Sequence, residues 1–373
     1  MRSSILAPGQ NHQLLQRTDQ FARIAGEAAS RADETGNICR VVLQALCESG
    51  LTMAAFDAAV GGAGLGEPDQ QPTLCTILRR IGAADLSVAR LFEGHVNAIM
   101  LVSKYGTSAQ IASLAASVRN GNLTGVWGAE DANGLRREPR DEAWSLQGRK
   151  VFASGAGLLA KPLVTVGTPQ GPIVYMLDLM PGHRADTSVW KPLGMKATAS
   201  GNIDLTNIVV GRSEQVGEPG DFMRQPFFSG GAWRFCAAQL GAMERLTGLY
   251  GDQLRARGRS SDPYQLERIA RCAAASGTAL FWIEEASRRF GDESLDPAAV
   301  VAFTNLTRMV TERAALEVIE SVQRGAGLGA FMHGNPIERI ARDLTTYLRQ
   351  PVPDLAMSDA ARSVLAGELT IGG

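Results

Sequence analysis

The order of hydrophobic patterns along the 373 residues constrains the fold most. Residues 14 to about 120 place apolar side chains at helical spacing, interrupted by a glycine-rich stretch at 60–66. Roughly a hundred residues follow in which short apolar runs lie between Gly, Pro and Asp turns, a pattern typical of strands. Helical spacing returns from residue 233 onward. Strands and helices are therefore segregated, which disfavours the strand–helix alternation of a Rossmann dehydrogenase.

These patterns predict three domains and a fold that is mainly α with a central β domain. We expect an N-terminal helical domain over 1–121, a central β domain over 122–228 and a C-terminal four-helix bundle over 229–373. The predicted strands lie at 144–148, 163–166, 173–177 and 203–210. The predicted bundle helices lie at 233–255, 264–289, 297–324 and 337–348, with one further short helix at 359–367.

Composition excludes several classes of partner and compartment. Lys and Arg total 37 against 38 Asp and Glu, so no basic surplus would attract nucleic acid or an anionic membrane. The five cysteines are scattered without a C-x-x-C pair, which favours reduced thiols over a disulfide scaffold or a zinc site. No apolar stretch reaches the roughly 18 residues of a membrane span, and the start shows no hydrophobic signal core. We therefore expect a cytoplasmic protein with no membrane span and no metal site.

Few side chains can titrate near neutral pH, because histidine is the residue type that ordinarily does so and the chain has only four. His95 shares a helical face with Val88, Phe92 and Ile99, so its imidazole points toward packed surface. From the pattern alone, a core histidine is favoured over a chemical role. No His-x-x-x-His, Glu-x-x-His or Gly-x-Ser-x-Gly spacing occurs, which removes the usual signals of zinc hydrolases, di-iron bundles and α/β-hydrolases.

Two glycine-containing segments are compatible with cofactor contact. Residues 148–156 combine a turn, a strand and a Ser-Gly end, where backbone N–H groups could approach a flat ring and the Ser154 hydroxyl could bond a ring heteroatom. An ordinary strand followed by a glycine turn explains this segment equally well. Gly325 and Gly327 follow a helix rather than a strand, so a helix C-cap and turn is favoured there over a dinucleotide fingerprint.

The last long helix carries two i,i+4 charge pairs. Glu338 with Arg342, and Arg339 with Asp343, have the spacing that usually supports an exposed helix by a few tenths of a kcal/mol. Pro336 at the start of this helix, and Pro351 and Pro353 at its end, predict a short helix with rigid boundaries that presents residues 347–350 at its carboxyl end.

Several stretches in sequence order resemble the acyl-CoA dehydrogenase superfamily over nearly the whole chain. They are the glycine-rich loop within 50–66, the His95 helix running into 104–107, the Trp-x-Leu-x-Gly-x-Lys turn at 144–150, and the segments 194–201 and 336–343. The resemblance implies a central β-barrel-like domain between the two helical domains. It also implies an FAD whose isoalloxazine lies between the β domain and the bundle, in a homodimer or homotetramer where the adenine half reaches a neighbouring subunit.

The same resemblance assigns residues to the flavin. Those matching the strand-end segment that lines the ring are Gly128, Ala129 and Glu130, and those matching the tripeptide beside its N5 are Phe152, Ala153 and Ser154. Arg257 matches the arginine that grips the pyrophosphate of a neighbouring subunit's FAD, a task that suits a bidentate guanidinium. Gly325 and Gly327 match the glycines that let backbone approach that dinucleotide.

The departures from the family concern the catalytic base and the dinucleotide. Family dehydrogenases use a glutamate at one of two places, which here read Gln350-Pro351 and Trp233, and none of these side chains accepts a proton. Leu135 replaces a serine of the family's flavin site, and a phenylalanine is missing after Arg257, so FMN is the alternative to FAD.

Three functions stay open at this point. The first is a flavin-dependent oxidoreductase acting on an acyl thioester, such as an acyl-CoA, or on a related activated carbon, with another base such as Glu93 or Asp354. The second is a two-component flavin-dependent monooxygenase or oxidase, in which His95 and Ser154 are the catalytic residues facing reduced flavin and oxygen. The third is a non-catalytic binding or assembly protein. The enzyme readings imply a small-molecule substrate and a flavin reductase or electron-transfer partner.

Overall fold

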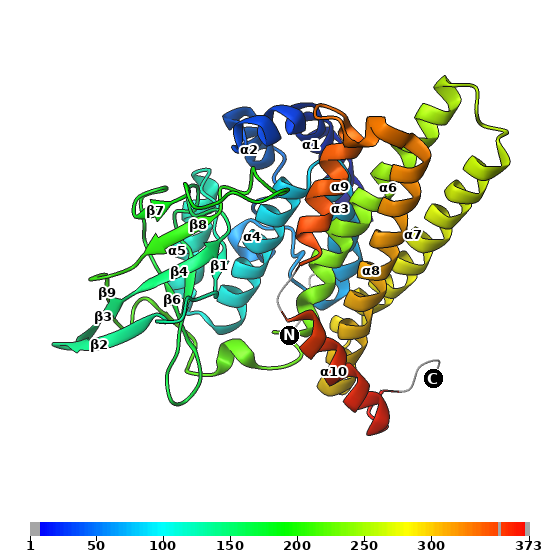
Figure 1. Cartoon of the computed structure of the whole chain (residues 1–373). Coiled ribbons are helices and arrows are strands. Elements are labelled where there is room, and N and C mark those ends of the chain that lie inside the picture. The colour runs from blue at the N-terminus through cyan, green and yellow to red at the C-terminus, as the bar shows by residue number, and fades with distance from the viewer. Residues whose placement is uncertain (1–7, 350–351, 370–373) are drawn as a thin grey trace.

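The computed structural model describes residues 8–349 and 352–369, and Figure 1 shows their arrangement. The N-terminal helical part contains five α-helices and a long loop with two short 3-10 turns between the second and third. The helices are α1 (Pro8–Thr35), α2 (Arg40–Glu48), α3 (Gln71–Ala84), α4 (Leu86–Tyr105) and α5 (Ser108–Arg119).

Short strands follow and form three small sheets within the described residues. The four-stranded sheet has the order β1-β5-β6-β10, and the two three-stranded sheets have the orders β2-β3-β9 and β4-β8-β7. The strands are β1 (Val126–Trp127), β2 (Arg136–Arg140), β3 (Ala143–Gln147), β4 (Arg149–Ala153), β5 (Leu163–Val166), β6 (Ile173–Met176), β7 (Ala185–Asp186), β8 (Gly201–Asp204), β9 (Val209–Val210) and β10 (Gln215–Val216).

One predicted strand is wrong in its extent. The apolar run at 203–210 forms two strands, β8 and β9, that pair in different sheets. Asn207 between them has a left-handed backbone with φ of 66°, a conformation that Asn tolerates better than most residues. The chain therefore turns where the hydrophobic pattern alone predicts continuity.

The C-terminal part is helical, and its first four helices lie close to the predicted boundaries. The short helix expected at 359–367 instead begins six residues earlier, at Pro353, because proline is tolerated in the first turn of a helix. The helices of this part are α6 (Trp233–Ala256), α7 (Pro263–Phe290), α8 (Pro297–Ala326), α9 (Pro336–Tyr347) and α10 (Pro353–Leu365). Three of them begin at an Asp-Pro or Asn-Pro pair, in which the first side chain caps the backbone N–H groups and proline pre-sets the first turn. The caps are Asp262, Asp296 and Asn335. These local signals explain why the helix starts were predictable.

The bundle includes a helix from the N-terminal part. Helices α6, α7 and α8 pack against one another, and α3 packs along α6. Two glycines allow this close approach: a Cβ on Gly241 would lie 1.9 Å from the Arg79 carbonyl oxygen, and one on Gly82 would lie 2.0 Å from that of Ala238. Any larger side chain at either position would force α3 and α6 apart.

Helix α9 is not the exposed helix that its charge pairs suggested. Arg339 and Asp343 are 8% and 4% exposed. Arg342 pairs with Glu338 on its own helix and with Asp33 of α1, at 2.7 Å in both cases. The expectation of solvated i,i+4 pairs is therefore wrong, because α9 is enclosed by α1, α4, α6 and α8.

One continuous apolar core runs through the helical and β parts. Figure 1 shows α4 between the strands and the bundle, and α4 contacts β1, α6 and α9. No helix of the described residues is long and apolar enough to cross a bilayer. Helix α4 thus lines the junction where strand ends, the start of α6 and the end of α9 meet.

Candidate active site

A cavity of about 1020 Å³ lies at this junction. Small-molecule sites commonly measure about 300–1,000 Å³, so this one can hold a tricyclic ring with space beside it. Its walls come from α4, from the segments after β1 and within β4, from the segment before α6 and from the ends of α6 and α9 that face the strands. The polar or charged lining residues are Arg90, Glu93, Asn97, Glu130, Ser154, Thr165, Thr198, Ser200, Arg234, Thr346 and Arg349.

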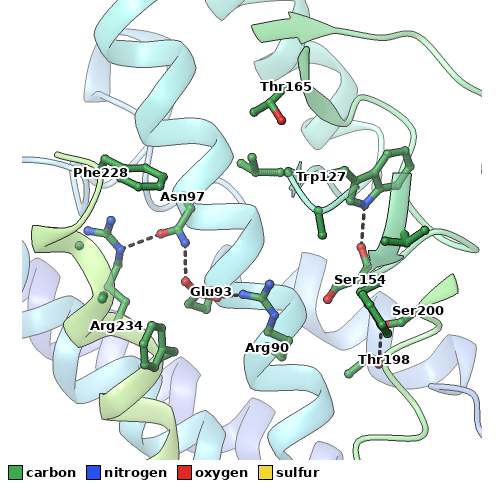
Figure 2. Close-up of a pocket in the computed structure, with 18 of the residues that line it drawn as sticks. Arg90, Glu93, Asn97, Trp127, Ser154, Thr165, Thr198, Ser200, Phe228 and Arg234 are labelled. Carbon is green, nitrogen blue, oxygen red and sulfur yellow. Dashed lines mark hydrogen bonds and ion pairs between the residues drawn. The ribbon is translucent and has the colours of Figure 1, made fainter. Parts of the chain in front are cut away.

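The strand side of the cavity has a strained backbone. Phe152 has φ of 50°, which is unfavourable for a bulky side chain, and its ring is 72% exposed on the cavity wall. The pairing of β4 with β8 shifts register between Lys150 and Ala153, as in a β-bulge. Next, the Ser154 carbonyl oxygen accepts a hydrogen bond from Trp127 Nε1 at 2.9 Å (Figure 2). Strain held in place by such contacts is a mark of functional sites.

Buried Lys150 fixes the neighbouring segment. Its Nζ donates to the Gly128 carbonyl oxygen at 3.2 Å and to Thr165 Oγ1 at 3.0 Å, and it forms an ion pair with Glu130. The side chain is fully buried, and this burial lowers the pKa of Lys150. The Ala129 carbonyl oxygen also accepts from the Val151 N–H at 3.1 Å, so residues 128–130 line the cavity as a rigid wall whose first two carbonyl oxygens are already engaged.

The helix side carries a chain of charged and amide groups, drawn in Figure 2. Glu93, with a side chain only 3% exposed, pairs with Arg90 one turn before it. Asn97, one turn after it, donates from Nδ2 to Glu93 Oε1. The Asn97 Oδ1 accepts from Arg234 Nε of α6 at 2.7 Å. Arg90, Glu93 and Asn97 stand at i, i+3 and i+7, and these steps of three and four residues align the side chains on one helix face.

Aromatic rings supply much of the remaining wall. Phe222 and Phe228 meet edge to face at 5.0 Å between ring centroids, and Phe227 meets Tyr105 in the same way at 5.9 Å. The aromatic lining residues are Trp127, Phe152, Trp190, Phe222, Phe227, Phe228, Phe235 and Tyr347. An apolar cavity with a few fixed polar groups is the usual form of a small-molecule site.

His95 does not line this cavity. It is fully buried on α4, where Nδ1 accepts a hydrogen bond from the Thr124 backbone N–H at 3.1 Å. The proton therefore lies on Nε2, which donates to the Thr52 carbonyl oxygen at 2.8 Å. Burial lowers the pKa of His95 to about 4. The sequence pattern left two interpretations of His95 open, a core histidine and a catalytic one. A neutral imidazole that is hydrogen-bonded to the backbone through both nitrogens fits the core histidine.

The remaining predicted flavin residues fall into two places. Gly128, Ala129, Glu130, Phe152 and Ser154 line the cavity, whereas Ala153 is buried behind it. Arg257 caps the other end of α6, about 36 Å along a helix of 24 residues. Gly325 packs against Tyr250 near that same end, where an added Cβ would lie 2.0 Å from the Tyr250 hydroxyl. Gly327, with φ of 71°, caps α8 there.

The positions considered for a catalytic base also differ in placement. Of the two family positions, Gln350-Pro351 lies outside the described residues, and Trp233 is fully buried. Asp354 is exposed on α10 and does not line the cavity. Glu93 does line it, so it is the one carboxylate of those weighed from the sequence that the structure brings there.

Sequence reasoning missed Arg90, Asn97 and Arg234. Arg90 and Asn97 could have been grouped with Glu93, because the three residues have the spacing of one helix face. Nothing in the sequence indicates that α6 brings Arg234 to them, because 137 residues separate it from Asn97. No group of His, Cys, Asp or Glu able to hold a metal occurs among the residues that the structure describes.

Comparison with known proteins identifies the fold. Residues 9–122 match the family model of the acyl-CoA dehydrogenase N-terminal domain. Butyryl-CoA dehydrogenase from Megasphaera elsdenii is 16% identical, with a TM-score of 0.83 over 98% of this chain and 100% of that one. This chain has the acyl-CoA dehydrogenase fold. The predicted fold class and the resemblance to that superfamily are confirmed.

Two further proteins are similar to this chain, one in structure and one in part of its sequence. FMN-bound TdsC from Paenibacillus sp. A11-2 is 20% identical, with a TM-score of 0.85 over 95% of this chain and 98% of that one. Dibenzothiophene monooxygenase from Rhodococcus erythropolis is 29% identical over 209 residues. That match spans 52% of this chain and 49% of the relative, so about half the length of each is compared.

Proposed function

We propose that this protein is a flavin-dependent oxidoreductase that holds the flavin ring in the cavity between α4 and the β sheets. The observation that carries the proposal is the strained strand edge at Phe152 to Ser154 facing an aromatic-walled cavity of about 1020 Å³. The residues present fit the group: the backbone N–H groups of 128–130 and the Ser154 hydroxyl would donate hydrogen bonds to ring heteroatoms, and Trp127 and Phe152 would offer apolar faces.

Among flavin reactions we favour a monooxygenase or oxidase over a thioester dehydrogenase. A reduced flavin bound here would supply two electrons to molecular oxygen, a reaction that needs no carboxylate base at the substrate carbon. In the cavity both carboxylate oxygens of Glu93 already accept hydrogen bonds from this chain, Oε2 from Arg90 and Oε1 from Asn97, so neither is left free for a substrate proton. The relatives that are named as dibenzothiophene monooxygenases support this choice.

The chain's own residues have definite tasks in this function. Lys150 holds the 128–130 wall rigid, and Ser154 orients the ring. The rings of Phe222, Phe227 and Phe228 exclude water from the substrate side. For this reaction the flavin would arrive reduced, which implies a flavin reductase as partner.

The cofactor form and assembly follow from the second group of predicted residues. Arg257, Gly325 and Gly327 lie too far along the bundle to reach a ring in this chain's cavity. They could serve only the adenine half of an FAD from another subunit of a dimer or tetramer. FMN needs none of them, and an FMN-bound structural relative supports FMN as the alternative to FAD.

The dehydrogenase remains the second candidate, because Glu93 is a carboxylate on the cavity wall. The two reactions are separated by mixing experiments on flavin-loaded protein. Oxidised flavin that bleaches under anaerobic conditions on addition of an acyl-CoA, and fails to bleach in Glu93→Gln, would establish the dehydrogenase. Substrate-dependent oxygen consumption by chemically reduced flavin–protein complex would establish the proposed reaction. A protein that binds neither FMN nor FAD would refute both and leave a binding or assembly role.

A further inference from the structure

Arg234 is a buried cation on the cavity wall that forms no ion pair among the described residues; the carboxylate whose charge it feels, Glu93, is already paired with Arg90. Arg234 is 3% exposed. The other lining arginines are paired, Arg90 with Glu93 and Arg349 with Glu312. Leaving one buried guanidinium unpaired is costly, so its presence calls for a partner that is not part of this chain.

Three contacts fix the guanidinium, and one of its terminal nitrogens has no hydrogen bond. Its Nε donates to Asn97 Oδ1, and Figure 2 shows it beside Asn97 and Phe228. Its Nη2 occupies the space over Gly231, where a Cβ would lie 2.1 Å away. The Phe290 ring centroid lies 4.9 Å from its central carbon. Its Nη1, although buried, has no hydrogen-bond partner.

This arrangement fixes the cation before any ligand arrives. Asn97 is itself oriented by Glu93, so the Glu93–Asn97 pair positions the guanidinium without neutralising it directly. Burial lowers the pKa of Arg234 to about 10, which leaves it protonated at neutral pH. A planar guanidinium with a free N–H edge is suited to bind a carboxylate-type oxyanion.

The surroundings define the rest of the ligand. Phe228 and Phe235 line the cavity with Arg234, as do Phe222 and Phe227. Since aromatic rings supply much of the apolar surface beside Arg234, a ligand bound there would place an apolar, ring-bearing body against them.

We propose that Arg234 is a specificity-determining residue that binds the oxyanion of the substrate, so that the cavity selects ring-bearing organic acids over their neutral analogues. This inference rests on the proposed function only in taking the same cavity as the substrate site. The oxyanion accepts hydrogen bonds from Nη1 and offsets the charge that the fold leaves unpaired.

The test measures binding by isothermal titration calorimetry, first on flavin-free protein. The probes are naphthalene-2-carboxylate and its primary amide, which share the ring and differ in charge. Wild-type protein should bind the carboxylate roughly 10- to 100-fold more tightly than the amide, the range expected for hydrogen bonds to a charged group. Arg234→Gln should lose this preference, and Arg234→Lys should retain a reduced one. Arg349→Gln, the matched control, should keep it because Arg349 is already paired.

Thermal stability provides a second readout. Arg234→Met should leave the melting temperature unchanged or raise it, because a buried unpaired charge is replaced by an apolar chain of similar length. If Arg234 had a purely structural role, its removal would destabilise the fold. A lower melting temperature of Arg234→Met would therefore contradict the proposal.

The outcomes distinguish this proposal from the proposed function. Equal binding of acid and amide by wild-type protein, or an unchanged preference in Arg234→Gln, would overturn it even if the protein binds flavin. Loss of FMN affinity in Arg234→Gln, with the acid preference intact, would also overturn it by assigning Arg234 to the cofactor. An Arg234-dependent acid preference in a protein that binds no flavin would support it while the proposed function fails.

Discussion

Asp343 of α9 accepts a hydrogen bond at 2.6 Å on Oδ1 from the backbone N–H of Met195, which lies in the β part of the chain. Met195 has φ of 61°, and the neighbouring Gly194 packs where a Cβ would lie 2.3 Å from the Arg342 carbonyl oxygen. Two stretches that the sequence singled out separately are thus one contact. It closes the cavity between the end of α9 and the β sheets, since Met195 and Thr346 both line it.

This contact predicts a pH dependence of stability. Burial, with a smaller effect from Asp85, raises the pKa of Asp343 from 3.8 to about 7, while Arg339 and the Met195 N–H oppose the rise. The folded protein therefore holds a proton that the unfolded chain releases above pH about 4. The stabilisation is complete below that pH and is lost as pH rises through about 7, with a slope of at most about 1.4 kcal/mol per pH unit.

Chemical denaturation of wild-type protein and Asp343→Asn between pH 4 and pH 8 checks this prediction. Asparagine keeps an acceptor for the Met195 N–H but does not titrate. The free energy of unfolding of wild type relative to the variant should fall as pH rises. A difference that is constant with pH would contradict the buried, protonated carboxyl.

His95→Ala is expected to lower stability rather than to change chemistry. The substitution leaves the Thr124 N–H and the Thr52 carbonyl oxygen without their buried partner, at about 1–3 kcal/mol for each unsatisfied group. Thermal melts should show the loss, while flavin binding by the folded fraction stays unchanged. Altered reaction of bound flavin with oxygen at unchanged stability would restore the catalytic role expected from the sequence.

Ser154→Ala is expected to weaken flavin binding by roughly 2- to 10-fold, the worth of one hydrogen bond, and to shift the visible flavin spectrum. Ser188→Ala is the matched control, because Ser188 is an exposed serine of the same β region that bonds Asp186 and does not line the cavity. Flavin titrations that give the same spectrum and affinity for Ser154→Ala as for the control would argue against the placement of the ring.

Gly241→Ala tests the close packing of α3 on α6. The added methyl group would lie 1.9 Å from the Arg79 carbonyl oxygen, so we expect a loss of about 1–3 kcal/mol or more in the free energy of unfolding. Gly248→Ala on the same helix meets nothing within 4 Å and should stabilise by up to about 1 kcal/mol. Equal effects of the two substitutions would mean that the helices are not in this contact.

The helices could be predicted from local sequence signals, whereas features that depend on tertiary contacts could not. Helix α8 was expected over 297–324 and spans Pro297–Ala326, because apolar periodicity and the Asp296-Pro297 start both act within the helix. The break at Asn207 depends on which sheets β8 and β9 join, and hydrophobic pattern is silent about that. The burial of Arg339 depends on how α9 is covered by other helices.

The site divides in the same way. Ser154 and Phe152 were singled out because the resemblance implied a flavin contact for them; the structure places both on the cavity wall and adds the strained backbone of Phe152, which no sequence pattern encodes. His95 could not be resolved from spacing, since its two backbone partners, at Thr52 and Thr124, are distant in sequence. Nothing in the sequence distinguishes Arg234 from the other arginines, because its hydrogen bond to Asn97 depends on how α6 packs beside α4.

The most direct test of the central claim is a crystal structure of the protein with saturating FMN. The account predicts electron density for the tricyclic ring in the cavity, against residues 152–154 and the backbone of 128–130, with Arg234 left free to face a substrate. Density for the ring elsewhere on the protein, or a cavity filled by the chain's own side chains at saturating FMN, would contradict it.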